Sequence, residues 1–343
     1  MKKWIHHLRR VAYSIRYYYK VNQRFSQFDL PQLTREEKYE VRKTWPGVTI
    51  IPLDWICVRV FKKIHGFSPY YLAPCWWNEL RVAINPRDQL YSLENKALCD
   101  IYFPDLSFPE TYVRGLNGNF YDKDMNFISG AEAVALLKCK GEYVIKPAIG
   151  TLQGQGVKKV NSQKDSIIDS FKTGGGNFIA QEVLKQAIEI EELNPSSLNC
   201  FRVTTIYLNG VFDFATSLKV GKAGAFRDNW NSAYWIDVSK KGVLSEFGFD
   251  YDVNAVSRSD GGIAFKGRVI PHFQDMIDHL EKMHKKLFAN CGVIGWDVTL
   301  DRDYKVRIIE TNLYNPGTNI EQFVSGDFFK AYRDVLLNAF NKR

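Results

Sequence analysis

Segment 143–157 combines a lysine and several glycines in a pattern that could bind phosphate. Lys146 stands at the end of a short apolar run, and the loop that follows contains Gly150, Gly154 and Gly156. Glycines let backbone N–H groups approach phosphate oxygens closely. The spacing matches neither a GxxxxGK[ST] loop nor a GxGxxG turn that opens a helix, so both of those nucleotide motifs are excluded. The segment predicts a nucleotide-phosphate site of another kind, and the alternative is an ordinary hairpin turn.

A second segment, 294–312, brings together two carboxylates and an amide that could hold a cation. Its two apolar runs flank a turn at 301–304, which predicts a hairpin in which Asp297 faces Ile308. Glu310 is then the diagonal neighbour of Asp297 on the same face, and Asn312 points there as well. Such oxygen ligands suit Mg²⁺, which takes one or two carboxylates and completes its shell with water and phosphate oxygens. The alternative is a solvated face whose acids point to water.

Turn signals and periodicity place both segments on β-strands. Residues 111–113 and 119–121 flank a Gly-Leu-Asn-Gly turn, and helical spacing after a Ser cap predicts a helix over 129–139, followed by a strand over 142–146. Further strands are expected at 178–184, 200–208, 212–220, 293–300 and 305–311, and helices at 271–288 and 327–340. Hairpins mixed with separate helices predict an α+β protein with antiparallel sheets.

The positive charge of the chain is concentrated at its beginning. The sequence has 46 Lys and Arg against 38 Asp and Glu, but seven of the basic residues precede position 25 and the first acid is Asp29. The rest of the chain is nearly neutral, whereas a nucleic-acid binder spreads positive charge over its groove-facing surface. No nucleic-acid partner is therefore expected.

The basic segment 1–24 also has the pattern of an amphipathic helix. Apolar residues recur on one side at steps of four and three, namely Trp4, Leu8, Val11, Ile15 and Tyr18. This pattern predicts a helix that lies on an anionic membrane surface. The alternative is a helix that packs on its own protein or on a partner.

The remaining composition indicates an ordinary folded protein that stays in the cytoplasm. With 343 residues, 45% of them hydrophobic, the chain is long enough for two or three packed units. No apolar run is long enough to cross a bilayer, and the first residues lack the pattern of a secretion signal. Six widely spaced cysteines without a zinc-ligand pattern are expected to be reduced thiols in the core.

Segments 143–157 and 294–312 together, in this order, resemble the ATP-grasp superfamily. More narrowly, the stretch from about 90 to 330 resembles the sugar-transfer-associated ATP-grasp proteins found with genes for cell-surface polysaccharides such as capsule. The matching text is Glu94-Asn-Lys96, Val144-Ile-Lys-Pro147, Ala180-Gln-Glu-Val183, Leu198-Asn-Cys-Phe-Arg-Val203, the run from Lys219 to Asn229, Ile294-Gly-Trp-Asp297 and Glu310-Thr-Asn312. The resemblance implies an ATP-grasp fold in which two α+β subdomains grip ATP, beside a mostly helical N-terminal region. We therefore expect a basic helix over 1–24, an N-terminal region over 25–90 and an ATP-grasp domain over 91–343, divided into a nucleotide-gripping part (about 108–190) and a metal and acceptor part (191–343).

The resemblance also implies roles for nucleotide-binding residues. Lys96 and Lys146 would reach ATP phosphates, and the loop through Gly154 and Gly156 would close over the triphosphate. The backbone that reads the adenine edge would be that of Gln181, Glu182, Val183 and Leu184. Many relatives begin this strand with Glu-Glu where this chain has Gln181 and Glu182, so the ribose contact departs from the family pattern.

The same resemblance implies a metal and acceptor site. Asp297, Glu310 and Asn312 would hold the magnesium ions that bridge the β- and γ-phosphates. Arg202 and Lys219 would lie near the γ-phosphate or the acceptor, and Asp228 and Asn229 are candidates for contact with the acceptor itself.

Several of these residues have simpler interpretations. Lys96 could be a surface lysine on a helix. Arg202 alternates with apolar neighbours on a strand and could be a structural ion-pair partner. Asp228 and Asn229 form a turn-forming pair by composition.

Together these features predict an ATP-dependent ligase that joins a carboxylate to an amine through an acyl phosphate, with release of ADP. The resemblance suggests that it modifies an acidic sugar or an amino acid in surface-polysaccharide assembly. Two other hypotheses remain open: a kinase that phosphorylates a sugar hydroxyl, and a non-catalytic binding module tethered to the inner face of the membrane by residues 1–24.

Overall fold

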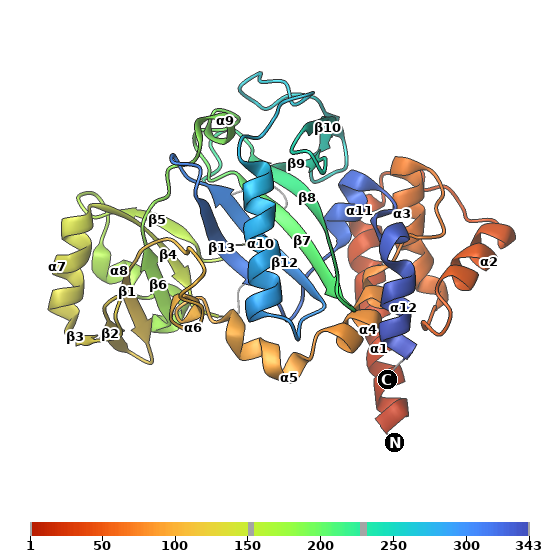
Figure 1. Cartoon of the computed structure of the whole chain (residues 1–343), viewed down its shortest axis with the longest axis horizontal. Coiled ribbons are helices and arrows are strands. Elements are labelled where there is room, and N and C mark those ends of the chain that lie inside the picture. The colour runs from red at the N-terminus through yellow and green to blue at the C-terminus, as the bar shows by residue number, and fades with distance from the viewer. Residues whose placement is uncertain (1, 150–153, 227–231, 342–343) are drawn as a thin grey trace.

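The computed structural model describes residues 2–149, 154–226 and 232–341, with side chains described from residue 10 onward. It contains two antiparallel sheets with a helical region at one end (Figure 1). The six-stranded sheet and the helical region lie on opposite sides of the seven-stranded sheet (Figure 1). The predicted α+β class with antiparallel sheets is confirmed, since every strand pair is antiparallel.

The six-stranded sheet has the strand order β3-β2-β1-β6-β4-β5. Its strands are β1 (Thr111–Leu116), β2 (Asn119–Tyr121), β3 (Phe127–Ile128), β4 (Glu142–Pro147), β5 (Lys158–Asn161) and β6 (Phe178–Gln181). Its helices are α7 (Gly130–Lys140), α8 (Ile167–Ser170) and η3 (Thr173–Gly176). Ser129 begins α7 with a capping box, because its side chain accepts from the Glu132 N–H while the Glu132 carboxylate accepts from the Ser129 N–H. The expected hairpin, helix and strand are thus confirmed, and β4 brings Lys146 to the sheet end next to the glycine loop.

The seven-stranded sheet has the strand order β11-β10-β9-β8-β7-β12-β13. Its strands are β7 (Cys200–Leu208), β8 (Val211–Gly221), β9 (Ala233–Val238), β10 (Leu244–Phe249), β11 (Ala255–Val256), β12 (Val293–Leu300) and β13 (Val306–Asn312). Helix α10 (Phe273–Leu287) covers one face (Figure 1), and the short helix α9 (Ile188–Glu191) precedes β7. The predicted strands at β7, β8, β12 and β13 and the helix at α10 are confirmed, whereas β9, β10 and β11 were not expected.

The register of the β12–β13 hairpin differs from the prediction. Asp297 faces Glu310 directly and not Ile308, which faces Val298. The turn is longer than expected, because Tyr304 adopts a left-handed φ of 59° and Asp301 pairs with Lys305. A bulge between Asp297 and Val298 then shifts the register once more. The two carboxylates are therefore closer neighbours on one face than the sequence suggested.

The first 90 residues are mostly helical, as predicted. The elements are α1 (Lys2–Phe25), α2 (Arg35–Thr44), η1 (Pro52–Asp54), α3 (Trp55–His65), α4 (Pro74–Ile84) and α5 (Arg87–Leu90), followed by η2 (Tyr91–Glu94) and α6 (Cys99–Tyr102). Helices α1 to α4 share one core with the end of the chain, α11 (Asn319–Ser325), η4 (Phe328–Tyr332) and α12 (Arg333–Asn341), whereas Leu90 of α5 belongs to the core of the seven-stranded sheet. The expected C-terminal helix thus forms in two pieces, and α11 was not predicted.

Helix α1 packs on its own protein, but only partly through the predicted apolar face, of which Val11 and Tyr18 are half-buried and Tyr18 packs against the core. Its buried side includes Arg10, Ser14, Val21 and Phe25, while Ile15 is 40% exposed. Arg10 can be buried because its guanidinium lies 2.7 Å from the carboxylate of Asp54. A pattern of apolar residues cannot reveal a face that is held by a paired charge. The side chains of Trp4 and Leu8 lie outside the described part of the chain.

Two further expectations can be compared with the structure. All six cysteines are free, and five of them are buried. Within residues 2–149, 154–226 and 232–341, no helix is long and apolar enough to cross a membrane.

Candidate active site

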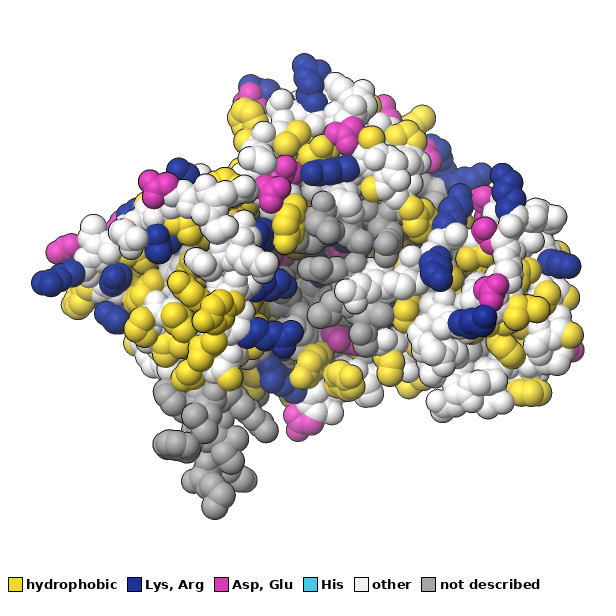
Figure 2. Space-filling model, turned by 180° about the vertical axis from the view of Figure 1, so that it is seen from behind, with side chains coloured by type: hydrophobic (Ala, Val, Ile, Leu, Met, Phe, Trp, Pro, Cys, Tyr) yellow, Lys and Arg dark blue, Asp and Glu magenta, His cyan; other side chains and the backbone are white. Residues whose placement is uncertain are grey.

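One cleft of about 1190 Å³ is lined by both sheets and by the helical region. Its volume exceeds the 300–1,000 Å³ that is typical of a single small-molecule pocket. On the face seen from behind, Lys and Arg side chains gather along the hollow in the middle of the molecule (Figure 2). Most predicted site residues line this cleft, namely Lys96, Lys146, Gly154, Glu182, Val183, Leu184, Arg202, Lys219, Asp297, Glu310 and Asn312.

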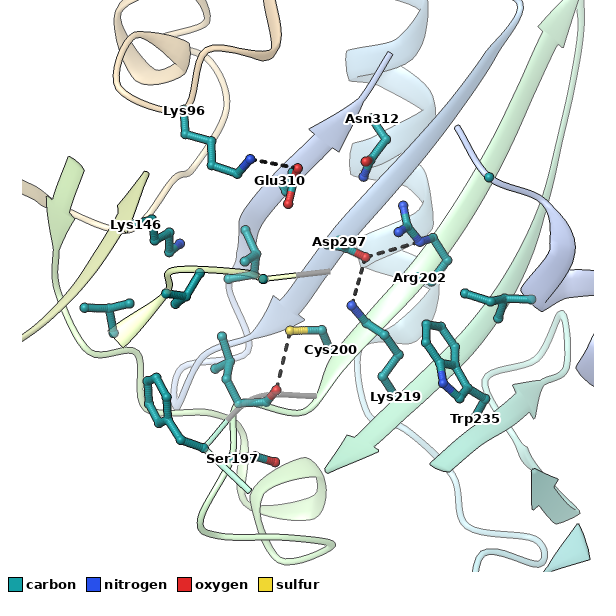
Figure 3. A pocket seen from close by; sticks show the side chains of 18 of the residues that line it. Lys96, Lys146, Ser197, Cys200, Arg202, Lys219, Trp235, Asp297, Glu310 and Asn312 are labelled. Atoms are coloured by element: carbon teal, nitrogen blue, oxygen red, sulfur yellow. Dashed lines mark hydrogen bonds and ion pairs between the residues drawn. The ribbon is translucent and has the colours of Figure 1, made fainter. Parts of the chain in front are cut away.

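Asp297 is the central residue among those that the seven-stranded sheet contributes to the cleft. Strand pairing sets Arg202 of β7 directly beside it, and Lys219 of β8 opposite Cys200 one strand further on. Its Oδ1 lies 3.3 Å from Arg202 Nε and 3.1 Å from Lys219 Nζ (Figure 3). Burial would raise the pKa of Asp297, but the charges of Arg202 and Lys219 outweigh it and hold this pKa below its usual value. Asp297 is thus a buried anion shared by two cations.

Glu310 and two lysines form the part of the site between the sheets. Glu310 faces Asp297 across the hairpin, and its carboxylate lies 3.1 Å from Lys96 Nζ (Figure 3). Lys146 lies beside them (Figure 3), and burial lowers its pKa while the charge of Glu310 partly opposes the shift. Segments around 146 and 310, far apart in the sequence, therefore meet at one cleft, as the sequence-based prediction required.

Glu94 is a site residue to which the sequence reasoning gave no role. One oxygen of its carboxylate accepts the N–H groups of Leu313 and Tyr314, each at 2.6 Å. Burial raises the pKa of Glu94, although these two backbone donors oppose that shift. Glu94 thereby ties the segment of Lys96 to the chain directly after Asn312. Its place in the Glu94-Asn-Lys96 text was the signal that could have identified it.

The strand expected at 178–184 ends at Gln181. Gln181 still pairs with Val144 and Thr111, whereas Val183 and Leu184 join neither sheet in the described structure. Gln181 lies in a small pocket next to the main cleft, and its amide donates to the Pro109 carbonyl. The carboxylate of Glu182 pairs with Arg307 and accepts the Glu110 N–H at 2.8 Å. Val183 and Leu184 thus line the cleft, and their backbone is not used in either sheet.

The described end of the glycine loop lies close to the end of β4. Gly154 and Gly156 have φ values of 66° and 75°, which glycine adopts without strain. A Cβ atom on Gly156 would lie 2.7 Å from Cγ of Pro147, so a side chain there would collide with the strand end. Gly154 lines the cleft. Gly150, Asp228 and Asn229 lie outside the described residues.

The oxygen atoms at this site fit a hard divalent cation. Among the residues that the structure describes, no three His, Cys, Asp or Glu side chains gather as a metal site. The candidate ligands are two facing carboxylates, Asp297 and Glu310, with the amide of Asn312 on the same strand. This set matches Mg²⁺, which uses few protein ligands when phosphate oxygens complete its shell. The surrounding cations, Lys96, Lys146, Arg202 and Lys219, suit a polyanion.

Comparisons with solved structures returned proteins of low identity. D-alanyl-alanine synthetase A from Vibrio cholerae is 11% identical with a TM-score of 0.44, and the match covers 73% of this chain and 65% of that one. The ATP-grasp ligase PsnB with its minimal precursor is 14% identical at 0.42, covering 73% and 61%. The D-cycloserine synthetase DcsG is 13% identical at 0.41, covering 76% and 74%. The chain spans less than two thirds of the length of the first two, and these likenesses carry no argument about its reaction.

The sequence comparisons are more decisive. A search of the curated proteins found no match. The family described as sugar-transfer associated ATP-grasp matches residues 77–333, well over half of the chain. This range includes both sheets and every predicted site residue. The chain therefore belongs to the sugar-transfer-associated ATP-grasp family.

Proposed function

We propose that the protein is an ATP-dependent, ADP-forming ligase that joins a carboxylate to an amine through an acyl phosphate. The observation that carries the proposal is the convergence of four cations, Lys96, Lys146, Arg202 and Lys219, on two facing carboxylates in one cleft. A triphosphate needs such charge, because phosphoryl transfer depends mainly on positioning and on neutralising the phosphoryl oxygens.

Each sheet contributes a different part of the proposed reaction. Lys96 and Lys146 bind the phosphates between the sheets, and the backbone of residues 183 and 184 faces the adenine. Arg202 and Lys219 hold the γ-phosphoryl group and the acceptor carboxylate in line. Because both are anchored by Asp297 at 3.3 and 3.1 Å, they offer fixed positive charge without reorganisation during the reaction.

Asp297, Glu310 and Asn312 are the residues proposed to hold magnesium. When bound there, Mg²⁺ supplies charge neutralisation at the phosphate oxygens. The chain's own cations now neutralise the same carboxylates, with Lys96 on Glu310 and Lys219 on Asp297. Metal binding and these ion pairs therefore compete for the same oxygens, and we expect magnesium affinity to rise when the nucleotide phosphates engage the lysines.

The chain solves a specific chemical problem at this site. A carboxylate is a poor electrophile, and transfer of the γ-phosphoryl group to it gives an acyl phosphate. An amine then attacks the acyl carbon, the C–O bond to phosphate breaks, and phosphate leaves as the amide forms. The glycine loop, whose described end lies against Pro147, is proposed to keep water away from the intermediate.

The test is product analysis with ATP, Mg²⁺ and pairs of candidate acids and amines. The proposal expects ADP and phosphate to appear in equal amounts only when both acid and amine are present. Release of AMP and pyrophosphate would rule it out. A phosphorylated sugar formed without amine would instead identify the kinase.

The non-catalytic alternative needs a test in cells. We expect the double variant Asp297→Ala and Glu310→Ala to lose the surface polysaccharide that depends on this protein. Normal polysaccharide with this variant, present at the wild-type level, would favour a binding module.

We also propose that α1 contacts an anionic membrane surface through the side that does not pack on the protein. Tyr13, Ile15 and Tyr19 are exposed there, and Arg16 is an exposed cation on the same helix. Deleting α1 would remove buried core residues, so the sharper variant is Ile15→Ser with Tyr19→Ser. It is expected to abolish sedimentation with vesicles containing anionic lipid, and unchanged sedimentation would contradict membrane contact.

A further inference from the structure

The cleft continues beyond the phosphate-binding residues to the helical region. Tyr17, Lys20 and Arg24 of α1 line it, together with Phe61 of α3 and with Asn319 and Phe323 of α11. We call these six residues the helical wall. Four of them precede residue 77, where the family match begins. Most of the helical wall therefore lies outside the part of the chain that the family match covers.

The helical wall is held in place by contacts between segments far apart in the sequence. The Asn319 amide donates to the Tyr17 hydroxyl at 3.0 Å. The ring of Phe323 lies 6.3 Å from that of Phe25 and 5.2 Å from that of Phe61, measured between centroids. A wall fixed in this way can discriminate between ligands, because little conformational freedom is lost when one binds.

The helical wall is also positively charged. Of the described cleft-lining residues on α1, α3 and α11, none is Asp or Glu, whereas Lys20 and Arg24 are cations. The Arg24 guanidinium lies 4.0 Å from the ring centroid of Tyr251 and donates to the Tyr251 carbonyl. Asp250 and Asp252 lie near Arg24, but neither lines the cleft. Asp250 has its own partners, since its oxygens lie 3.9 Å from Lys222 Nζ and accept two backbone N–H groups.

These observations bear on acceptor recognition, because the reacting carboxylate of the acceptor must lie next to the γ-phosphate of ATP. Its reacting carboxylate is placed by Arg202 and Lys219 in the proposed function. The helical wall lines the same cleft as these two residues. We propose that the helical wall is the acceptor-recognition surface, and that it selects an acceptor carrying a second negative group beside its reacting carboxylate. This inference rests on the proposed function.

The test uses two probes that share one ring and one carboxylate. D-Glucuronic acid 1-phosphate carries a second anion, and methyl α-D-glucuronide does not. Binding is measured by isothermal titration in the full chain with Mg·ADP present. The wild-type protein is expected to bind the phosphate about tenfold more tightly, as one charge-assisted contact provides.

Variants then locate the difference. Arg24→Gln should remove most of the preference, and Lys20→Gln should reduce it without any risk to the fold, because Lys20 is exposed. Arg16→Gln is the matched control: Arg16 is an exposed arginine on the same helix that does not line the cleft. It should keep the preference of the wild-type protein.

The outcomes separate this inference from the proposed function. Equal binding of the two probes, binding of neither, or the same loss in Arg16→Gln as in Arg24→Gln would overturn the inference. Absence of Mg·ATP binding would overturn the proposed function, and the preference between the two probes, measured without nucleotide, would still decide the role of the helical wall.

Discussion

The two sheets contribute to the cleft in different ways. The core of the six-stranded sheet is small and apolar, built around residues such as Val113, Leu137 and Phe178, and the sheet presents Lys146 at a strand end beside a glycine loop. The seven-stranded sheet and helix α10 bury charged and polar groups that include Asp297, Lys219, Thr204 and His284, and the six-stranded sheet buries Arg114 beside Asp100, away from the cleft. Buried polar groups must be paired, so each position depends on its neighbours.

This difference shows how the work of binding is divided. The seven-stranded sheet fixes charge by pairing it internally, which gives accurate positions but makes the sheet sensitive to loss of one partner. The six-stranded sheet supplies a lysine whose burial lowers its pKa, and a glycine loop whose backbone conformation glycine adopts without strain. We therefore expect substitutions in the seven-stranded sheet to lower both the unfolding free energy and the activity. Substitutions in the six-stranded sheet should mainly weaken nucleotide binding.

The largest expected effect comes from Asp297→Asn. It leaves Arg202 and Lys219 without their shared carboxylate, and breaking a buried ion pair from one side costs about 3 kcal/mol of unfolding free energy. ADP formation should fall by at least about 100-fold, since one preorganised electrostatic contact has this effect. The measurements are denaturant unfolding and ADP release. Asp303→Asn, an exposed acid in the turn of the same hairpin, is the control, and equal stability of the two variants would contradict the proposed internal pairing.

The next effect is a loss of stability at low pH caused by His284, which lies on helix α10 against the seven-stranded sheet. Trp296 donates to the Thr205 hydroxyl at 2.8 Å, this hydroxyl lies 2.8 Å from His284 Nδ1, and His284 Nε2 lies 2.7 Å from the Cys291 carbonyl. A carbonyl oxygen can only accept, so Nε2 donates to it, and in the neutral ring that burial favours Nδ1 accepts from the Thr205 hydroxyl. Burial lowers the pKa of His284 to about 4, although the bond to Cys291 opposes the shift.

Stability should therefore fall as the pH decreases. Between pH 6.5 and about 4 the unfolded chain binds a proton that folded His284 refuses, which removes about 3 kcal/mol of unfolding free energy. His284→Gln should reduce the pH dependence of the unfolding free energy in this range. His272→Gln, which changes an exposed histidine, should keep the wild-type slope. Identical slopes for wild type and His284→Gln would show that His284 is not the group responsible.

Lys146→Met tests the six-stranded sheet. We expect the Kd for Mg·ATP to rise at least about tenfold, because a charge-assisted contact to phosphate is lost. The unfolding free energy should not fall, since a buried ammonium is replaced by an apolar chain. Lys158→Met, at an exposed position on β5 that does not line the cleft, is the control for titration calorimetry. A large loss of stability without a change in Kd would contradict the expectation that the six-stranded sheet affects mainly nucleotide binding.

The smallest effect is expected for Gly156→Ala. Both Gly156→Ala and Gly118→Ala place a Cβ at a positive φ, which costs about 1 kcal/mol. Only Gly156 has a neighbour in the way, the Pro147 ring, whereas nothing lies within 4 Å at Gly118. Nucleotide affinity should therefore weaken roughly threefold for Gly156→Ala alone. Equal affinities of the two variants would show that the position of the loop at Gly156 does not affect nucleotide binding.

Much of the fold could be predicted because its signals are local. The hairpin at 111–121, the capped helix α7 and the strands β7, β8, β12 and β13 follow from turn residues, a capping box and β-branched runs. The hairpin register could not be predicted, since it depends on Tyr304 in a left-handed conformation and on a bulge beside Asp297. Strands β9 to β11 were missed because tertiary pairing, and not an alternating pattern, defines them.

The candidate site was predictable only as a set of residues. Side-chain type and order along the chain pointed to Lys146, Asp297, Glu310 and Asn312, and the structure places all four at the same cleft. Which groups neutralise one another could not be read from the sequence. Lys96 on Glu310, and Arg202 with Lys219 on Asp297, are pairs between different elements.

The sequence by itself determined the chemistry available to this protein: the lysines, the carboxylates, the glycines and a basic first helix. The tertiary structure decided where that first helix goes. Its buried side is held by Arg10 on Asp54, and its other residues reach the cleft at Tyr17 and Arg24. The physical reason is that a charge can be buried only beside its partner, and the partner of Arg10 lies 44 residues away in the chain.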